Sequence, residues 1–112
     1  MAKAIIAKTN NFTKKMAINI GTSIALQDMA GQKITSIQAA AIVTDVDRET
    51  GEEKEVAIIV DESGMSYSAI SATVLSQMED VIDLLDDGES FDIIVVSRKS
   101  KGGRDFITLN VV

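Results

Sequence analysis

Hydrophobic positions between residues 33 and 112 fall into five short segments and one longer segment with helical spacing. Most of the short segments are rich in Ile and Val, which favours strands, and they cover residues 33–46, 54–61, 65–70, 91–98 and 105–112. The longer segment, residues 72–87, predicts an amphipathic helix that has Ser71 as its N-cap and ends before Gly88. Its apolar stripe consists of Val74, Leu75, Met78, Val81, Ile82 and Leu85. The predicted order is therefore strand, strand, strand, helix, strand, strand.

Two of the predicted strands have features that constrain the fold. In residues 33–46, Ile34 and Ile37 lie on opposite faces of an ideal strand, so the pattern slips once and predicts a bulge or a strong bend. In residues 54–61 hydrophobic side chains occupy both faces, so we expect both faces of this strand to be covered. A long, bent first strand and a doubly covered second strand suit a small barrel.

The first 31 residues have a weaker pattern than the rest of the chain. We expect a short strand over Ala4–Ala7, a turn at Asn10 and Asn11, a strand over Phe12–Ile20, and a helical turn capped by Ser23 that ends at Gly31. Residues 1–31 then form an N-terminal extension. The sequence leaves open whether this extension covers the barrel, extends the sheet or mediates dimerisation.

The element order favours a mainly β fold with one helix. It is the order of the oligonucleotide-binding (OB) fold, a five-stranded, partly open barrel. The length of 112 residues fits one domain. We therefore expect a single OB-like domain over residues 1–112, with the barrel in residues 32–112 and the N-terminal extension packed on it or extending it.

The composition argues against most catalytic chemistry. The chain has no His and no Cys, so it lacks an imidazole base, a thiolate nucleophile and the usual zinc ligands. The acidic clusters at residues 45–53 and 83–87 lack EF-hand spacing, and a solvated surface is the favoured interpretation. We expect no enzymatic activity, no metal and no cofactor. No apolar run has the length of a membrane span, and we expect a cytoplasmic protein.

Charge is distributed unevenly, with a net value of −6 but a local excess of cations near the C-terminus. Four of the eleven basic residues fall within seven positions of one glycine-containing loop, namely Arg98, Lys99, Lys101 and Arg104. In an OB fold the loop between the last two strands contacts the ligand, and its cations would neutralise phosphates. The alternative is an ordinary solvated hairpin loop, because exposed loops are commonly polar.

Aromatic side chains that could stack on bases are few, since the chain has one Tyr and three Phe. Tyr67 in the third strand and Phe106 at the start of the last strand are the stacking candidates, whereas Phe91 is expected in the core. The remaining candidates for nucleic-acid binding are basic residues of the N-terminal third, namely Lys14, Lys15 and Lys33.

Four segments border the predicted strands in a recognisable arrangement. They are Gly31-Gln32-Lys33-Ile34, residues 47–53, Tyr67-Ser68-Ala69-Ile70-Ser71 and residues 97–106. In this arrangement residues 26–112 resemble the small single-stranded DNA-binding proteins of tailed bacteriophages. The resemblance implies an OB fold that holds unpaired DNA during phage replication or recombination. Many single-stranded DNA-binding proteins end in an acidic tail, whereas this chain ends in Leu109-Asn110-Val111-Val112, which puts recruitment of partners through such a tail in doubt.

Two functions from different classes are consistent with the sequence. The one we favour is non-catalytic, sequence-nonspecific binding of single-stranded DNA in the host cytoplasm, alongside phage replication or recombination proteins. The alternative is a protein-interaction or virion structural module without nucleic-acid binding, which the net negative charge and the few aromatic residues favour. Both hypotheses allow a homo-oligomer, formed through the N-terminal extension or by head-to-tail contact between the acidic and basic patches.

Overall fold

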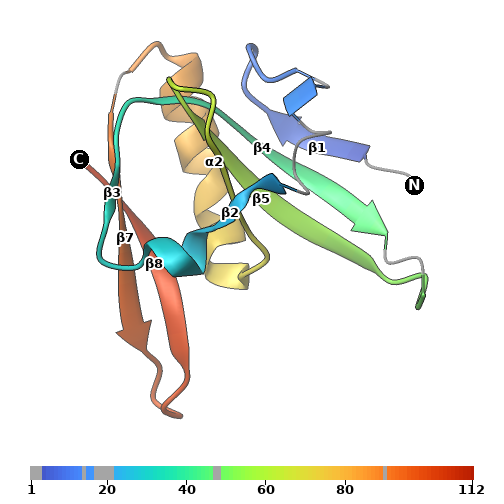
Figure 1. Ribbon diagram of the computed structural model, residues 1–112, viewed down its shortest axis with the longest axis vertical. Helices are drawn as coiled ribbons and strands as arrows, with labels where there is room; N and C mark the ends of the chain where they lie inside the picture. The colour runs from blue at the N-terminus through green and yellow to red at the C-terminus, as the bar shows by residue number, and fades with distance from the viewer. Residues whose placement is uncertain (1–3, 14, 17–21, 47–48, 90) are drawn as a thin grey trace.

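The computed structural model describes residues 4–13, 15–16, 22–46, 49–89 and 91–112 (Figure 1). Within these ranges the protein is mainly β with one long α-helix, which confirms this part of the predicted fold class. The elements are β1 (Ala4–Lys8), β2 (Ile24–Ala25), the 3-10 helix η2 (Leu26–Met29), β3 (Lys33–Ile34), β4 (Ile37–Val46), β5 (Glu53–Asp61), β6 (Ser66–Ala69), α2 (Ala72–Asp86), β7 (Ile93–Lys99) and β8 (Asp105–Val111).

The strands form two sheets. One has the order β1-β4-β5-β6-β2 and the other the order β3-β7-β8, and α2 packs against β4 and β8 between them (Figure 1). The predicted long first strand is β3 and β4 together: β3 pairs with β7 in one sheet, and β4 pairs with β5 in the other. The predicted irregularity is confirmed, because the register of β4 against β5 shifts between Ile37 and Ala39.

The described strands do not close into the predicted five-stranded barrel. Closure would require β6 to pair with β8, but the outer edge of β6 pairs instead with β2, in parallel, through Ile24 and Tyr67. The short strand β2 belongs to the N-terminal region, so this region extends the sheet. The two sheets therefore stay separate along the line between β6 and β8.

The core has two parts, one on each face of β5. Ala57 and Ile59 point into the larger cluster, which α2 and the three-stranded sheet complete. Val56, Ile58 and Val60 point into a smaller cluster, which is covered by the buried ring of Phe12 together with Ile5. The expectation that both faces of this strand are covered is thus confirmed, and the cover on the second face comes from the N-terminal segment.

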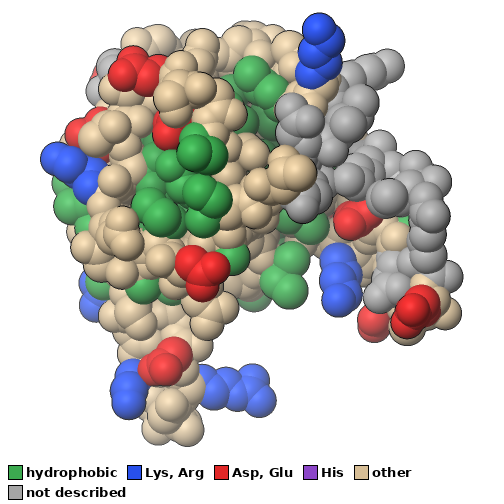
Figure 2. All heavy atoms as spheres, viewed as in Figure 1, with side chains coloured by type: hydrophobic (Ala, Val, Ile, Leu, Met, Phe, Trp, Pro, Cys, Tyr) green, Lys and Arg blue, Asp and Glu red, His purple; other side chains and the backbone are tan. Residues whose placement is uncertain are grey.

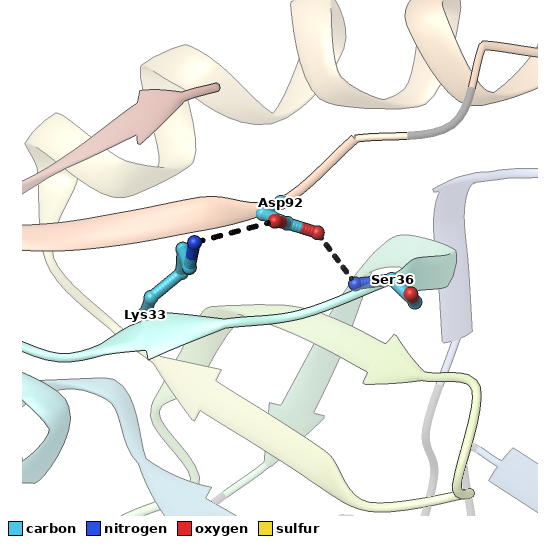
Figure 3. A network of polar contacts seen from close by, with 3 residues as sticks. All are labelled: Lys33, Ser36 and Asp92. Atoms are coloured by element: carbon cyan, nitrogen blue, oxygen red, sulfur yellow. Dashed lines mark hydrogen bonds and ion pairs between the residues drawn. The ribbon is translucent and has the colours of Figure 1, made fainter.

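The bend between β3 and β4 depends on one acidic side chain. Ser36 has a φ of 53°, a left-handed conformation that few residues other than glycine adopt readily. Its N–H donates to Asp92 Oδ1 at 2.9 Å, and Asp92 Oδ2 lies 3.7 Å from Lys33 Nζ (Figure 3). Asp92 precedes β7, so it joins the bend to the second sheet.

Replacement of Asp92 by alanine is expected to lower the free energy of unfolding by about 1 to 2 kcal/mol, because Ser36 N–H loses its acceptor. Asp92→Asn keeps an acceptor oxygen and should lose less. Lys33→Ala should have little effect, since the pair is exposed. Urea denaturation of the three variants checks this order, and equal losses from Asp92→Asn and Asp92→Ala would contradict it.

The structure differs from several of the local predictions. Ser23 does not cap the helical turn, because β2 intervenes and Ser23 Oγ lies 2.6 Å from Ser68 Oγ instead. Ser71 occupies the N-cap position of α2 but makes no side-chain capping bond, whereas Gly88 has the positive φ expected after the helix. Most of the strand predicted over residues 12–20 lies outside the described residues, and the described part, residues 12–13 and 15–16, is not a strand. Among the described residues, none of the helices has the length and apolar character of a membrane span.

Candidate functional site

The predicted basic loop is the tip of the β7–β8 hairpin. Strand pairing continues as far as Lys99 and Asp105, so β7 ends one residue beyond the predicted end at Arg98 and the loop is limited to residues 100–104. Ser100 N donates to Arg104 O at 2.8 Å, and Gly103 N donates to Ser100 O at 3.0 Å. Gly103 has a φ of 82°, which a side chain would strain. The tip is therefore a defined turn that carries its cations on a two-stranded ribbon.

We call residues 98–105 the basic hairpin. All eight residues are exposed, and their net charge is +3 in a chain whose total is −6. Figure 2 shows Lys and Arg side chains on both sides of the projecting tip. Such an arrangement concentrates positive charge at one end of an acidic protein, where an extended anion can reach it from solvent.

Phe106 and Arg98 lie directly opposite each other on β8 and β7. Cross-strand partners project from the same face of a sheet with Cβ atoms about 5 Å apart. Lys99 and Asp105, the next pair, project from the other face. Phe106 is half-buried, so part of its ring is accessible next to the Arg98 side chain.

Tyr67, the second predicted stacking residue, lies in the core. Its side chain is 7% exposed, and its hydroxyl donates to Asp61 Oδ2 at 3.3 Å. Burial raises the pKa of Tyr67 above its ordinary value of 10.0, and the negative charge of Asp61 and the hydrogen bond to it raise this pKa further. The ring offers almost no surface to a base in this structure.

The raised pKa of Tyr67 predicts a loss of stability at high pH. Because the folded protein holds the phenolic proton more tightly than the unfolded chain, this contribution is complete below pH 10.0 and is lost as pH rises through the folded pKa. Tyr67 is the only tyrosine, so absorbance of tyrosinate follows this group alone. Tyr67→Phe should remove this part of the pH dependence of urea unfolding. An identical decline in the wild type and in Tyr67→Phe would refute the assignment.

The other basic candidates are not part of the hairpin. Lys33 lies on β3 with its Nζ near Asp92. Lys15 is exposed in the segment after β1, and Figure 1 shows this segment at the end of the molecule opposite the hairpin tip. Lys14 lies outside the described residues. The structure thus brings together Arg98, Lys99, Lys101, Arg104 and Phe106, and it separates Lys15, Lys33 and Tyr67 from them.

A groove of about 590 Å³ lies beside the basic hairpin, where β6 and β8 remain unpaired. Its lining comes from β2 and η2 with their flanks, from the end of β6, and from the distal half of the β7–β8 hairpin. Six of the eleven lining side chains are Ala or Ser, which carry no charge and no aromatic ring, so the sequence did not single them out as site residues, whereas Phe106 is the one lining residue that it did. The residues are Ala25, Gln27, Ala30, Ser68, Ala69, Ile70, Ser71, Ser97, Asp105, Phe106 and Ile107.

The acidic clusters lie on other elements. Residues 45–55, which include the ends of β4 and β5, carry a net charge of −4, and Asp83, Asp86 and Asp87 lie at the end of α2. Asp86 Oδ1 accepts a hydrogen bond from Asn10 N at 3.1 Å. Among the described residues, no group of three or more acidic side chains is placed to hold a metal ion.

Comparison with known proteins distinguishes between the two hypotheses. The family model described as Phage Single-stranded DNA-binding protein matches residues 3–112. No curated protein and no solved structure matches the chain. The match covers nearly the whole chain and favours the nucleic-acid hypothesis over the protein-interaction or virion module.

Proposed function

Because the chain belongs to the family of phage single-stranded DNA-binding proteins, we propose that the basic hairpin is the surface on which this protein binds the DNA backbone. The observation that carries the proposal is the convergence of four exposed cations on one projecting ribbon. Each phosphate neutralised on a single strand contributes about −0.7 to the slope of log K against log salt. Four contacts would therefore weaken binding about 50-fold when salt rises from about 50 to about 200 mM.

Charge also supports this choice of surface. The other long hairpin, β4–β5, is the counterpart of the first ligand-contacting loop of an OB fold, but residues 45–55 carry a net charge of −4. Such a surface repels phosphates. The DNA backbone is thus expected to follow the basic hairpin and to avoid the β4–β5 end.

Phe106 supplies the stacking surface in this proposal. It lies opposite Arg98, so a base stacked on the accessible part of its ring would have its phosphate within reach of a guanidinium. Stacking on an aromatic side chain contributes about 1 to 3 kcal/mol per base. The DNA-binding roles predicted from the sequence for Lys14, Lys15, Lys33 and Tyr67 remain predictions. Tyr67 supports β6 from the core.

Phe106→Ala is accordingly expected to weaken binding of oligothymidylate by about 5- to 100-fold, with the salt dependence unchanged. Phe106→Tyr should bind like the wild type, because the aromatic face remains. Fluorescence anisotropy with a labelled oligonucleotide measures both variants. Full affinity in Phe106→Ala would exclude stacking on this face of the hairpin.

The proposed role is to cover unpaired DNA during phage replication or recombination in the host cytoplasm, without catalysis. The order β4, β5, β6, α2, β7, β8, with a first strand shared by both sheets, supports an OB-type architecture opened between β6 and β8. In this proposal residues 1–112 act as one domain, and replication proteins and further copies of the chain are its partners.

A further inference from the structure

The outer edge of β8 is open along part of its length. Val95 of β7 directs its N–H and C=O away from β8, because they bond to Gln32 O at 3.1 Å and Gly31 N at 2.7 Å. Val95 and Leu109 are therefore a non-hydrogen-bonded pair of the antiparallel ladder. By alternation, the backbone groups of Asp105, Ile107 and Leu109 all face outward from the sheet.

One of these positions is already occupied by a planar amide. Gln77 Nε2, on α2, donates to Leu109 O at 3.0 Å, and Leu109 N donates to Gln77 Oε1 at 2.9 Å. The carboxamide presents a donor and an acceptor side by side, and the strand edge matches both. This edge therefore binds a flat group with that pair of functions.

At Ile107, two residues nearer the tip, the alternation directs the same pair of backbone groups outward, and Ile107 lines the groove. Within the described part of the chain no strand pairs with β8 on this side. Asp105, Phe106 and Ile107 all line the groove, and since consecutive side chains point to opposite faces, the groove follows the edge of the strand. On the opposite wall, Ile70 is 63% exposed beside the small side chains of Ala69 and Ser71.

We propose that this groove takes an unpaired base, whose Watson–Crick edge bonds to the backbone N–H and C=O of Ile107. The inference deepens the proposed function and rests on it, because the adjoining basic hairpin would hold the phosphates. All four bases carry a neighbouring donor and acceptor on that edge, so the contact accepts any sequence. In a duplex the Watson–Crick edge of each base is already paired with the partner base. The groove therefore selects single-stranded over double-stranded DNA.

The charge of Asp105 favours a base over the DNA backbone as the occupant of the groove. Asp105 lines the groove two residues from Ile107, and its negative charge would repel a phosphate placed there. The cations at the tip are outside the groove lining. The charge pattern thus keeps the phosphates on the hairpin and directs the uncharged base inward.

The experiment compares oligothymidylate with the same oligomer methylated at the N3 position of every thymine. Methylation removes the donor and blocks the Watson–Crick edge, but it keeps the phosphates and the ring face. We expect affinity to fall at least about tenfold, because both backbone bonds are lost. The slope of log K against log salt should stay the same, since the phosphate contacts remain.

A variant of the groove completes the test. Ala30 lines the groove and is exposed, so Ala30→Trp should fill it without unfolding the protein, and Ala30→Ser is the matched control. Ala30→Trp should bind plain oligothymidylate about tenfold more weakly and be insensitive to methylation. Circular dichroism melting verifies that the variant is folded.

Three results would overturn the inference. Equal binding of methylated and plain oligomers would exclude the Watson–Crick contact while leaving salt-dependent binding by the hairpin intact. Full affinity in folded Ala30→Trp would exclude the groove. A wild-type dimer in sedimentation that Ala30→Trp abolishes, with DNA binding unchanged, would assign the groove to a strand of a second copy. Failure of the proposed function is distinct, because binding would then lack salt dependence altogether.

Discussion

Replacement of Arg98, Lys99, Lys101 and Arg104 together by glutamine is expected to weaken binding of single-stranded DNA by about 100-fold or more at about 0.1 M salt. The four side chains are exposed on one ribbon, and no acidic side chain forms an ion pair with them among the described residues. Each cation is thus free to neutralise a phosphate and release its counterions. Anisotropy titration with a labelled oligonucleotide gives the dissociation constants.

The matched control tests position against net charge. Arg98→Gln/Arg104→Gln and Lys8→Gln/Lys54→Gln remove the same charge, but Lys8 and Lys54 lie on β1 and β5, away from the hairpin. Only the hairpin pair should weaken binding strongly. Equal losses in the two double variants would mean that DNA responds to the overall charge and not to this surface.

Asp61→Ala is expected to lower the free energy of unfolding by about 2 to 4 kcal/mol, the largest stability effect we predict for a polar side chain. Asp61 is 9% exposed at the end of β5. Its Oδ1 accepts from Ser63 N, Ser63 Oγ and Met65 N at 2.6 to 3.0 Å, and its Oδ2 accepts from the Tyr67 hydroxyl. One carboxylate thus closes the β5–β6 turn and holds the buried tyrosine, and alanine leaves all four donors without an acceptor.

Asp61→Asn separates these contributions. The amide oxygen can still accept from the turn, and its NH₂ group can donate to the Tyr67 oxygen, so we expect about half the loss. Urea unfolding followed by circular dichroism gives both values, and an unchanged denaturant slope shows that the native state is intact. A loss below about 1 kcal/mol for Asp61→Ala would contradict the structural role of this carboxylate.

The elements from residue 33 onward were predictable because their hydrophobic patterns are strong. The stripe on α2 and the two apolar faces of β5 each correspond to a surface that is buried in the structure. The open line between β6 and β8 was not predictable. It depends on β2, a strand of two residues that pairs with β6 through the backbone and has no pattern of its own.

The candidate site was predictable in part, for a similar reason. Charge clustering identified the basic hairpin, because four cations in seven positions are visible in the sequence. Tyr67 was a reasonable stacking candidate by residue type, but it is buried in the larger core cluster with its hydroxyl bonded to Asp61, and neither contact is visible in the sequence. The groove is lined mostly by small side chains, and Gln77 bonds to the backbone of Leu109, so apart from Phe106 neither feature carries a distinctive signal in the sequence.

The decisive measurement is the salt dependence of oligothymidylate binding by the wild type and by the variant that lacks all four hairpin cations. If the basic hairpin contacts the DNA backbone, the slope of log K against log salt becomes shallower by about 2 to 3 in the variant, because four phosphate contacts are lost. An unchanged slope would mean that the phosphates are bound elsewhere on the protein, and it would contradict the assignment of this surface.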